Sequence, residues 1–260
     1  MRINETSDGR IDSVVYRDVD GNEQTLAGDE FISSMPVKDL VDSIADGNQS
    51  TQPVPAKMKQ IADGLPYRDF VTVGFLVDHL NLKNETDIPT LGNPPIVPDC
   101  WIYVQDTSVK VGRIQVFNNW SPYLVKDVDN KVWIGLEYFC NEGDDFWNMS
   151  DAECIDFAAN ELVKMGIIAS KNDIQDAHRE RVKKAYPAYF DTWYQMDDLV
   201  KWLDSFENLY CVGRNGQHRY NNMDHSMVTA FEAVGNIKTG RADKKNVWNV
   251  NTDKEYHEEK

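Results

Sequence analysis

The sequence predicts an α/β or α+β protein in which an antiparallel sheet carries flanking helices, and three observations support this. Runs of β-branched and aromatic residues follow one another between residues 67 and 140, as in consecutive strands. From residue 150 onward, apolar residues recur with helical spacing. The 260 residues, 41% of them apolar, suffice for one large domain or two modest ones.

The N-terminal part is predicted to hold a hairpin, a short helix and a linker. Residues 11–35 alternate imperfectly about a turn at Asp20 and Gly21, which is typical of a hairpin. Pro36 ends it, and the segment VKDLVDSI is predicted to be a short helix. Residues 45–57 are polar and contain two prolines, which favours a linker at a subdomain boundary.

The middle of the chain is predicted to form the antiparallel sheet. A long strand, YRDFVTVGFLVDHL, begins at Tyr67, and a proline-containing loop covers residues 81–100. Further strands are expected to begin near Trp101, Gly112 and Val132. Such a sheet can have one face that is wet or lines a ligand. Aromatic residues gather mainly in this part, so it is expected to contain the main core or a ligand cleft.

The last third of the chain is predicted to be mainly helical. Ser150 and Glu153 have the spacing of a capping box, and an apolar stripe follows them. Residues 174–185 fit either a helix or a strand, and residues 196–206 form a short amphipathic helix. The charged tail after Gly240 is expected to fray.

Composition argues against several classes of partner. The 43 acidic and 27 basic residues give a net charge of -16, which opposes binding of nucleic acid. The longest apolar run, FVTVGFLV, is too short to span a bilayer, and the N-terminus lacks a signal-peptide core, so a cytoplasmic location without membrane partners is expected.

The cysteines and histidines predict no metal site. Four cysteines at irregular spacing form neither a zinc motif nor a disulfide framework, and free, mostly buried thiols are expected. His218 and His225 lie seven residues apart across a loop, which is not a ligand spacing. Both are expected to be structural or to neighbour a ligand.

A glycine-containing turn near the end of the chain is the strongest candidate for a ligand site. The segment LYCVG is predicted to be a short buried strand, and Gly213, Arg214 and Gly216 follow it before an apolar-periodic helix that starts near Asn222. This arrangement can bring backbone N–H groups and a helix N-terminus up to an anionic ligand. The same pattern also occurs in purely structural turns.

The run GRNGQHRYNNMDHSMVTAFEAVGNI at 213–237 resembles the C-terminal flavin-contacting signature of the UDP-galactopyranose mutase and flavin amine oxidase superfamily, closest to its mutase-like branch. Three segments are similar to the family in the same order: GLPYRDF at 64–70, GRIQVFNNWSPYL at 112–124 and KAYPAYFDTWYQ at 184–195. The GxGxxG fingerprint that opens such proteins does not occur in these 260 residues. The resemblance therefore implies the C-terminal portion of a longer flavoprotein.

The resemblance implies a partial, discontinuous FAD-binding domain with an inserted substrate domain built on the antiparallel sheet plus helices. Residues 1–50 would be an FAD-domain remnant, 51–204 the substrate domain, 205–240 the returning strand and helix, and 241–260 a charged tail. FAD is expected for the complete protein and an incomplete flavin site for this chain. The expected partners are a nucleotide sugar or other small molecule, and a missing N-terminal half or a second copy.

The family's cofactor contacts are carried over to the turn and the helix after it. Arg214 would lie beside the flavin and the substrate diphosphate, because its planar donors can bridge phosphate oxygens; the alternative is a structural ion pair. Backbone N–H groups of the helix start would face the flavin ring. The cofactor-binding set is Gly213, Arg214, Asn222, Met223, Asp224, His225 and Ser226.

The substrate-binding candidates come mainly from the middle segments. Arg68, next to Tyr67, would reach the diphosphate opposite Arg214, although Asp69 could neutralise it instead. Trp120 and Tyr123 could stack on a uracil or a sugar, although aromatic residues on a sheet more often belong to a core.

Three functions stay open. A mutase, which is an isomerase, would act on a UDP-sugar, and an amine oxidase or desaturase would be an oxidoreductase that takes a hydride. In both, the flavin carries the chemistry, so no catalytic side chain is assigned. Asp69 and Met223 stand where mutases usually have Ser and often have Gln, which weakens the mutase interpretation. The third possibility is a non-catalytic binding or assembly module with an exposed apolar docking surface.

Overall fold

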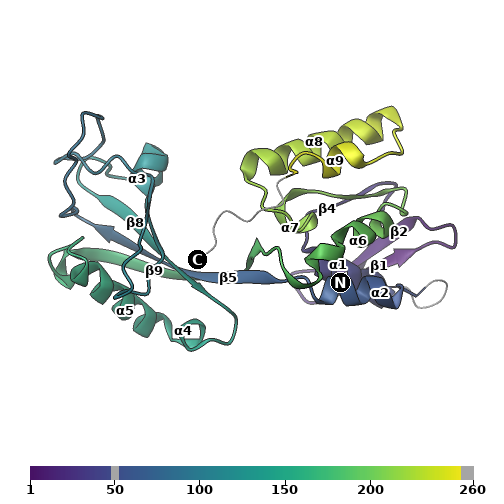
Figure 1. The fold of residues 1–260 in the computed structure, drawn as a ribbon, viewed down its shortest axis with the longest axis horizontal. Helices are drawn as coiled ribbons and strands as arrows, with labels where there is room; N and C mark the ends of the chain where they lie inside the picture. The colour runs from purple at the N-terminus through teal and green to yellow at the C-terminus, as the bar shows by residue number, and fades with distance from the viewer. Residues whose placement is uncertain (48–52, 253–260) are drawn as a thin grey trace. The chain divides into compact units, whose positions relative to one another are not determined.

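The computed structural model describes residues 1–47 and 53–252. The chain divides into two compact units (Figure 1). Unit 1 contains Met1–Tyr67 and Tyr186–Lys260, and unit 2 contains Arg68–Ala185. The chain crosses between them in two long strands, β5 (Tyr67–Val77) and β9 (Ile174–Pro187). The predicted α+β class and the insertion of one unit into the other are confirmed.

Unit 1 combines short sheets with helices. An antiparallel sheet contains β1 (Arg2–Glu5), β2 (Ile11–Arg17) and β3 (Glu23–Ala27). A second sheet pairs β4 (Phe31–Ser33) in parallel with β10 (Leu209–Cys211). The helices are α1 (Val37–Gly47), α2 (Ala56–Asp63), α6 (Met196–Leu203), α7 (Gly213–Gly216), α8 (Met223–Thr239) and α9 (Lys245–Trp248), with the 3-10 helix η3 (Asp191–Gln195).

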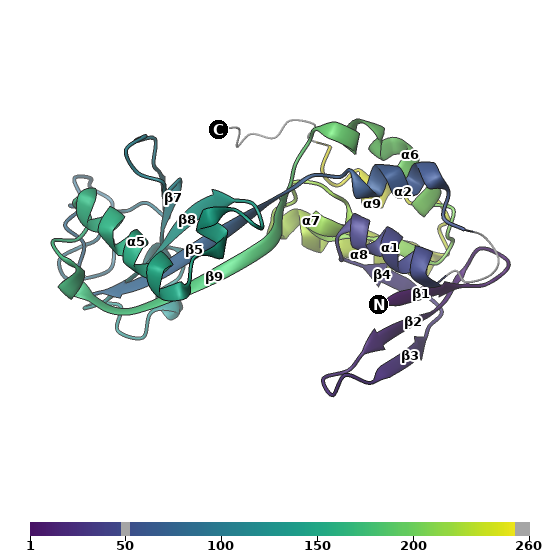
Figure 2. The same cartoon turned by 90° about the horizontal axis from the view of Figure 1, so that it is seen from below.

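Helix α1 forms where predicted, because its apolar residues recur with helical spacing. Val37, Leu40, Val41 and Ile44 are all fully buried, and they share a core with Ile3 of β1. Figure 2 shows α1 lying along β1 and next to α2. The polar strand β1 carried no alternation that would have predicted it.

The predicted hairpin of residues 11–35 is correct only as far as β3. Its last part leaves the hairpin as β4 and pairs with a strand near the other end of the chain. The buried Asn208 explains this change of partner. Its side-chain Nδ2 donates to the backbone carbonyls of Ile11 (2.8 Å) and Asp29 (2.9 Å). Its backbone carbonyl accepts the N–H of Phe31 (2.8 Å).

The unit boundaries differ from the domain limits expected at 50 and 204. Unit 2 begins later because Ile61 and Ala62 of α2 are buried in the core of unit 1. It ends earlier because Leu199 and Leu203 of α6 are buried in the same core. Of the predicted linker, residues 48–52 lie outside the described residues, and helix ends occupy part of the remainder.

Unit 2 is built on a five-stranded sheet in the order β6-β7-β8-β5-β9. Strand β8 (Val132–Cys140) is antiparallel to β5 and to β7 (Arg113–Val116), and β7 is antiparallel to β6 (Trp101–Tyr103). The predicted strands are confirmed, and residues 174–185 are a strand. The helices are α3 (Phe117–Trp120), α4 (Asp145–Asn148) and α5 (Asp151–Lys164), with 3-10 helices η1 (Pro122–Leu124) and η2 (Lys171–Asp173).

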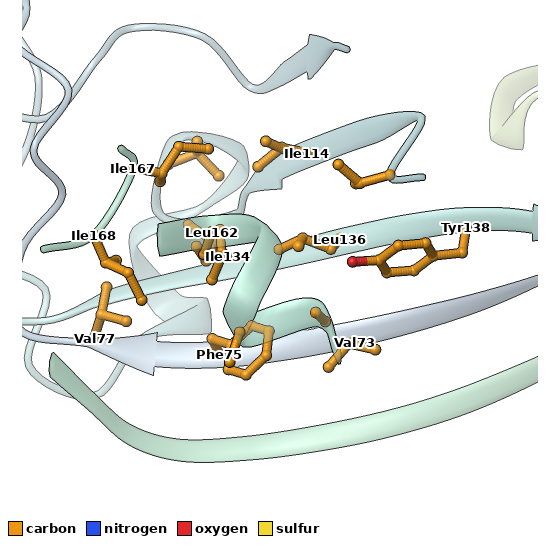
Figure 3. Packing of buried hydrophobic residues seen from close by; sticks show 14 of the residues in the cluster. Val73, Phe75, Val77, Ile114, Ile134, Leu136, Tyr138, Leu162, Ile167 and Ile168 are labelled. Atoms are coloured by element: carbon orange, nitrogen blue, oxygen red, sulfur yellow. The ribbon is translucent and has the colours of Figure 1, made fainter. Parts of the chain in front are cut away.

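One face of this sheet packs against α5 and forms the core of unit 2 (Figure 3). The capping box is confirmed, since Ser150 N–H donates to Glu153 Oε2 (2.9 Å) and Glu153 N–H donates to Ser150 Oγ (3.3 Å). Alternation along the strands puts every second residue on this face. The core residues drawn in Figure 3 include Val73, Phe75, Val77, Ile114, Ile134, Leu136, Tyr138 and Leu162.

The prediction that the chain frays after Gly240 is wrong for the described part. Gly240 caps α8 in the left-handed conformation (φ 66°), and the chain folds back as α9. Trp248 is 6% exposed, and its Nε1 donates to Asp204 Oδ1 (2.9 Å). The buried Lys244 Nζ donates to the carbonyls of Phe206 and Leu209. Residues 253–260 lie outside the described part.

Two further expectations concern thiols and membranes. All four cysteines are free, and Cys140, Cys154 and Cys211 are buried, as predicted. Within residues 1–47 and 53–252, no helix has both the length and the apolar character needed to cross a bilayer.

Truncation of Trp248 tests whether the C-terminal segment is part of the fold. Trp248→Ala should lower the free energy of unfolding by about 3–5 kcal/mol, because it leaves a cavity and removes the partner of Asp204. Chemical denaturation measures this, and Lys245→Ala on the exposed side of α9 is the matched control, with a change below about 0.5 kcal/mol. Equal stability of the two variants would mean that α9 does not pack.

Candidate functional site

The turn between β10 and α8 is shaped by its two glycines. Gly213 has a φ of 76°, a conformation that side chains rarely adopt, and its N–H donates to the buried Thr229 Oγ1 (2.9 Å). Gly216 lies against β4, where a Cβ atom would come within 2.6 Å of the Ser33 carbonyl oxygen. Each glycine therefore has a structural reason, and together they fix α7 between β4 and α8.

Arg214 projects from this turn and is held by aromatic rings. Its Nε donates to the Asn221 carbonyl (2.9 Å), and its guanidinium carbon lies 4.7 Å from the ring centre of Tyr220 and 5.2 Å from that of Tyr186. The two rings are nearly parallel, with 14° between their planes. Stacking of this kind orients the planar guanidinium group without removing its charge.

Residues 222–226 form the exposed start of α8. The N–H of Asn222 donates to His225 Nδ1 (3.3 Å), so His225 helps to cap the helix. Asp224 lies 3.5 Å from the same nitrogen, and the Met223 side chain is 79% exposed. Ser226 Oγ donates to the Asn222 carbonyl (2.9 Å). The predicted cofactor-binding residues are thus brought together at one junction with Gly213 and Arg214.

His218 and Tyr67 meet inside unit 1 although 151 residues separate them in the sequence. His218 is fully buried with a φ of 47°, and its Nε2 lies 3.2 Å from the Ala188 carbonyl oxygen. The Tyr67 ring packs edge-on against it, with 4.6 Å between ring centres, and the Tyr67 hydroxyl is buried. Burial of that hydroxyl favours a structural role for Tyr67, whose contact with a substrate stays a prediction.

Arg68 lies at the start of unit 2, in a different environment from Arg214. It is exposed, and its side chain has no hydrogen bond or ion pair with any residue that the structure describes. The Asp69 carboxylate accepts the backbone N–H groups of Glu142 (2.8 Å) and Lys184 (2.6 Å), so those amides, rather than Arg68, are its hydrogen-bond donors. Because Arg68 and Arg214 belong to separate units, their contact with one diphosphate stays a prediction.

An aromatic surface, defined here by Trp101, Tyr103 and Trp120, lies on the second face of the sheet in unit 2. Trp101 pairs in register with Gln115, and Tyr103 pairs with Arg113, which places both aromatic residues on the face opposite the core. The ring of Trp101 lies 5.4 Å from that of Trp120 and 6.3 Å from that of Tyr103. Tyr123 in η1 is 95% exposed.

A buried ion pair between Arg113 and Glu137 packs against the aromatic surface. Arg113 donates to Glu137 through Nε (2.8 Å), and the guanidinium carbon lies 4.8 Å from the Trp101 ring centre. Sequence analysis found Trp120 but missed Trp101 and Tyr103, whose alternation in WIY is the signal that could have indicated them.

The donor set at the α7–α8 junction suits a polar organic ligand better than a metal. Among the described residues, no group of three or more His, Cys, Asp or Glu side chains could hold a metal ion. Under the turn, the buried amide oxygens of Asn215 and Asn221 have no hydrogen-bond partner in the described structure. The cationic Arg214 and the exposed first turn of α8 offer donors for an anionic group, whereas the two amide oxygens can only accept hydrogen bonds.

No family model matches the sequence, and no curated protein matches it significantly. A crystal structure of reduced UDP-galactopyranose mutase superposes on this chain with a TM-score of 0.66 and 19% identity. The match covers 96% of this chain and 49% of the mutase chain. A putative protoporphyrinogen oxidase from Exiguobacterium sp. 255-15 superposes on 83%, with a TM-score of 0.55 and 12% identity, over 41% of that protein. The chain therefore shares their fold and spans about half or less of their length.

Burial of His218 predicts an acid-sensitive fold. Burial lowers the pKa of His218 from 6.5 to about 4, so the unfolded state takes up the proton first as the pH falls. The neutral His218 therefore contributes at most about 3 kcal/mol to the free energy of unfolding. This contribution is complete above pH 6.5 and is lost as the pH falls towards 4. The free energy of unfolding, measured from pH 7 to 4, should fall less steeply in His218→Asn, because Asn does not take up a proton in this range. Asn is chosen because it tolerates the positive φ of this position.

The exposed His79→Asn variant is the control, and it should keep the slope of the unchanged protein. Identical slopes for His218→Asn and the unchanged protein would contradict a neutral, buried imidazole.

Proposed function

We propose that this chain forms the C-terminal part of an FAD-dependent enzyme of the mutase type that acts on a nucleotide sugar. The observation that carries the proposal is the superposition on a UDP-galactopyranose mutase over 96% of the chain. The sequence resemblance at 213–237 supports it, because it falls on the junction where the candidate cofactor residues meet. In this proposal unit 1 contributes to the flavin site, and unit 2 is the substrate domain.

FAD would be held where α7 meets α8. The exposed start of α8 would present backbone N–H groups to it, with Met223 contributing through its backbone, and Gly213 would set the direction of the turn. The orphan amide oxygens of Asn215 and Asn221 are buried and would accept donors from bridging water. When bound, FAD would supply the nucleophile or the hydride acceptor of the reaction.

Arg214 would bind the anionic part of the cofactor or of the substrate. Its guanidinium group is already oriented by Tyr186 and Tyr220, so less side-chain entropy is lost on binding. A planar guanidinium can donate to two phosphate oxygens at once. The net charge of -16 repels a diphosphate, and a local cation such as Arg214 would offset this repulsion at the site.

Unit 2 would bind the sugar nucleotide. The aromatic surface of Trp101, Tyr103 and Trp120 offers ring faces and edges for a uracil or a sugar. Arg68 would supply the second cation for the diphosphate, because no described residue neutralises it through an ion pair. The role of Tyr123 rests only on its exposure in η1.

A second candidate is an oxidoreductase of the amine oxidase or desaturase type, which the weaker superposition on the putative protoporphyrinogen oxidase favours. A third is a non-catalytic binding or assembly module. Binding of FAD together with UDP-galactose supports the mutase, FAD alone supports the oxidoreductase, and binding of neither supports the module.

Titration with FAD, followed by flavin fluorescence and by thermal shift, tests the cofactor site. At a hundred times its Kd, FAD should stabilise the protein by about 2.7 kcal/mol. Arg214→Ala should weaken binding about tenfold or more through loss of a charge-assisted hydrogen bond, and Arg214→Lys should recover part of the loss. The exposed Arg241→Ala, which removes an ion pair with Asp243 (3.3 Å), is the control and should bind normally. Absence of any shift would refute the flavin site in this chain.

Titration with UDP-galactose separates the two arginines. Arg68→Ala should weaken UDP-galactose binding about tenfold or more and leave FAD binding unchanged, since Arg68 belongs to the other unit. Trp120→Ala should weaken the same ligand through loss of stacking. Calorimetry gives both constants, and equal losses for both ligands in Arg68→Ala would contradict a substrate-specific role.

A further inference from the structure

The loop of residues 217–221 carries the ring that lies nearest to Arg214. Tyr220 stacks on Tyr186 with 5.9 Å between ring centres, and the Arg214 guanidinium carbon lies 4.7 Å from the centre of the Tyr220 ring. Arg214 Nε also donates to the backbone carbonyl of Asn221, the next residue of the loop (2.9 Å). The direction of the guanidinium group therefore depends on where the loop holds Tyr220 and Asn221.

The backbone of Tyr220 is held by two side chains that are distant in the sequence. Its N–H donates to the hydroxyl of Tyr189 (2.6 Å), 31 residues earlier. Its carbonyl accepts the side-chain Nδ2 of Asn251 (3.1 Å), 31 residues later. Tyr220 belongs to no helix or strand, so these two hydrogen bonds take the place of a regular backbone ladder and fix the position of its ring.

The segment around Asn251 is bonded to the same loop at other residues. The backbone carbonyl of Asn251 accepts Nη1 of Arg219. The carbonyl of Val247 accepts the side-chain Nε2 of Gln217 (2.9 Å), and Gln217 is fully buried. The position of the loop is therefore tied to the C-terminal segment that includes α9.

Attachment of the C-terminal segment does not by itself explain the side chain of Asn251. Trp248 already anchors α9, because its ring is buried and its Nε1 donates to Asp204. Asn251 is 5% exposed, and burial of an amide costs free energy that an apolar side chain would avoid. The amide here donates to the carbonyl of the residue that orients Arg214. A guanidinium group that is held in place before binding loses less entropy when a ligand arrives.

We propose that Asn251 and Tyr189 are positioning residues for the binding of an anionic group by Arg214. They fix Tyr220, and Tyr220 holds the guanidinium group in the direction in which its planar donors can bind phosphate oxygens. In this proposal neither positioning residue touches the ligand. The inference deepens the proposed function and rests on the part of it that assigns an anionic ligand to Arg214.

Calorimetry with FAD, and in parallel with inorganic pyrophosphate, tests the proposal. Asn251→Ala should weaken binding roughly three- to tenfold, because the arginine side chain then has to be ordered on binding. Tyr189→Phe should cause a loss of similar size, since it removes only the hydroxyl and keeps the ring that stacks on Trp193 (4.5 Å between ring centres). Asn249→Ala, at an exposed asparagine in the same segment, is the matched control and should bind normally.

A double variant separates positioning from general stabilisation of the fold. In the Arg214→Ala background, Asn251→Ala should cause no further loss of affinity, because no guanidinium group is left to orient. A residue that only stabilised the fold would change the affinity equally in both backgrounds. Circular dichroism checks that each variant is folded under the conditions of the calorimetry.

The two ligands distinguish failure of this inference from failure of the proposed function. Unchanged affinities in Asn251→Ala and Tyr189→Phe, or an equal loss with and without Arg214, would overturn the positioning role while FAD binding still supports the flavin site. Binding of pyrophosphate but not of FAD, with the expected losses, would overturn the flavin site and support the positioning role. A chain that binds neither ligand would overturn both.

Discussion

The side-chain amide of Asn208 is the contact on which unit 1 depends. It is 1% exposed, and it exchanges hydrogen bonds with Ile11, which lies 197 residues earlier in the sequence. With the Asp29 carbonyl as its third partner, it joins the N-terminal sheet to the segment that leads into β10. A buried amide left without partners costs free energy, so these segments are stable only when they meet. The turn with Gly213 and Arg214 directly follows that strand and takes its position from it.

Arg113 and Arg214 lie in different environments, and the difference bears on the role of each. Arg113 is 2% exposed and donates to the buried Glu137, so its charge is compensated inside the sheet. Arg214 is half-buried, and its guanidinium carbon lies 4.7 Å from the ring centre of Tyr220 and 5.2 Å from that of Tyr186, so the two rings orient the group. The same residue type therefore supports a surface in unit 2 and is the candidate for anion binding in unit 1.

Sequence predicted the elements whose signals are local and missed those set by distant contacts. The strand from Tyr67, the capping box at Ser150 and the helix after Asn222 follow from alternation, capping and helical periodicity. The parallel pairing of β4, the meeting of Tyr67 with His218 and the burial of Trp248 depend on residues far away in the chain. In α8 the period was correct, but periodicity alone does not say which face of a helix is buried. At the candidate site, the segment 213–226 was found because its residues are consecutive, whereas Trp101 was read only as part of a strand.

The insertion of unit 2 has a consequence for the order of folding during synthesis. Unit 2 is one continuous segment, so its sheet and α5 can form as soon as Ala185 has left the ribosome. Unit 1 cannot complete its core at that stage, because α6, β10 and Trp248, with which α1 and β4 pack or pair, have not yet been made. Many multidomain chains fold from the N-terminus onward, whereas here α1 and β4 are made before unit 2 but complete their packing after it. Until then, the apolar stripe of α1 has only β1 and α2 to pack against, and chaperones have a defined segment to bind.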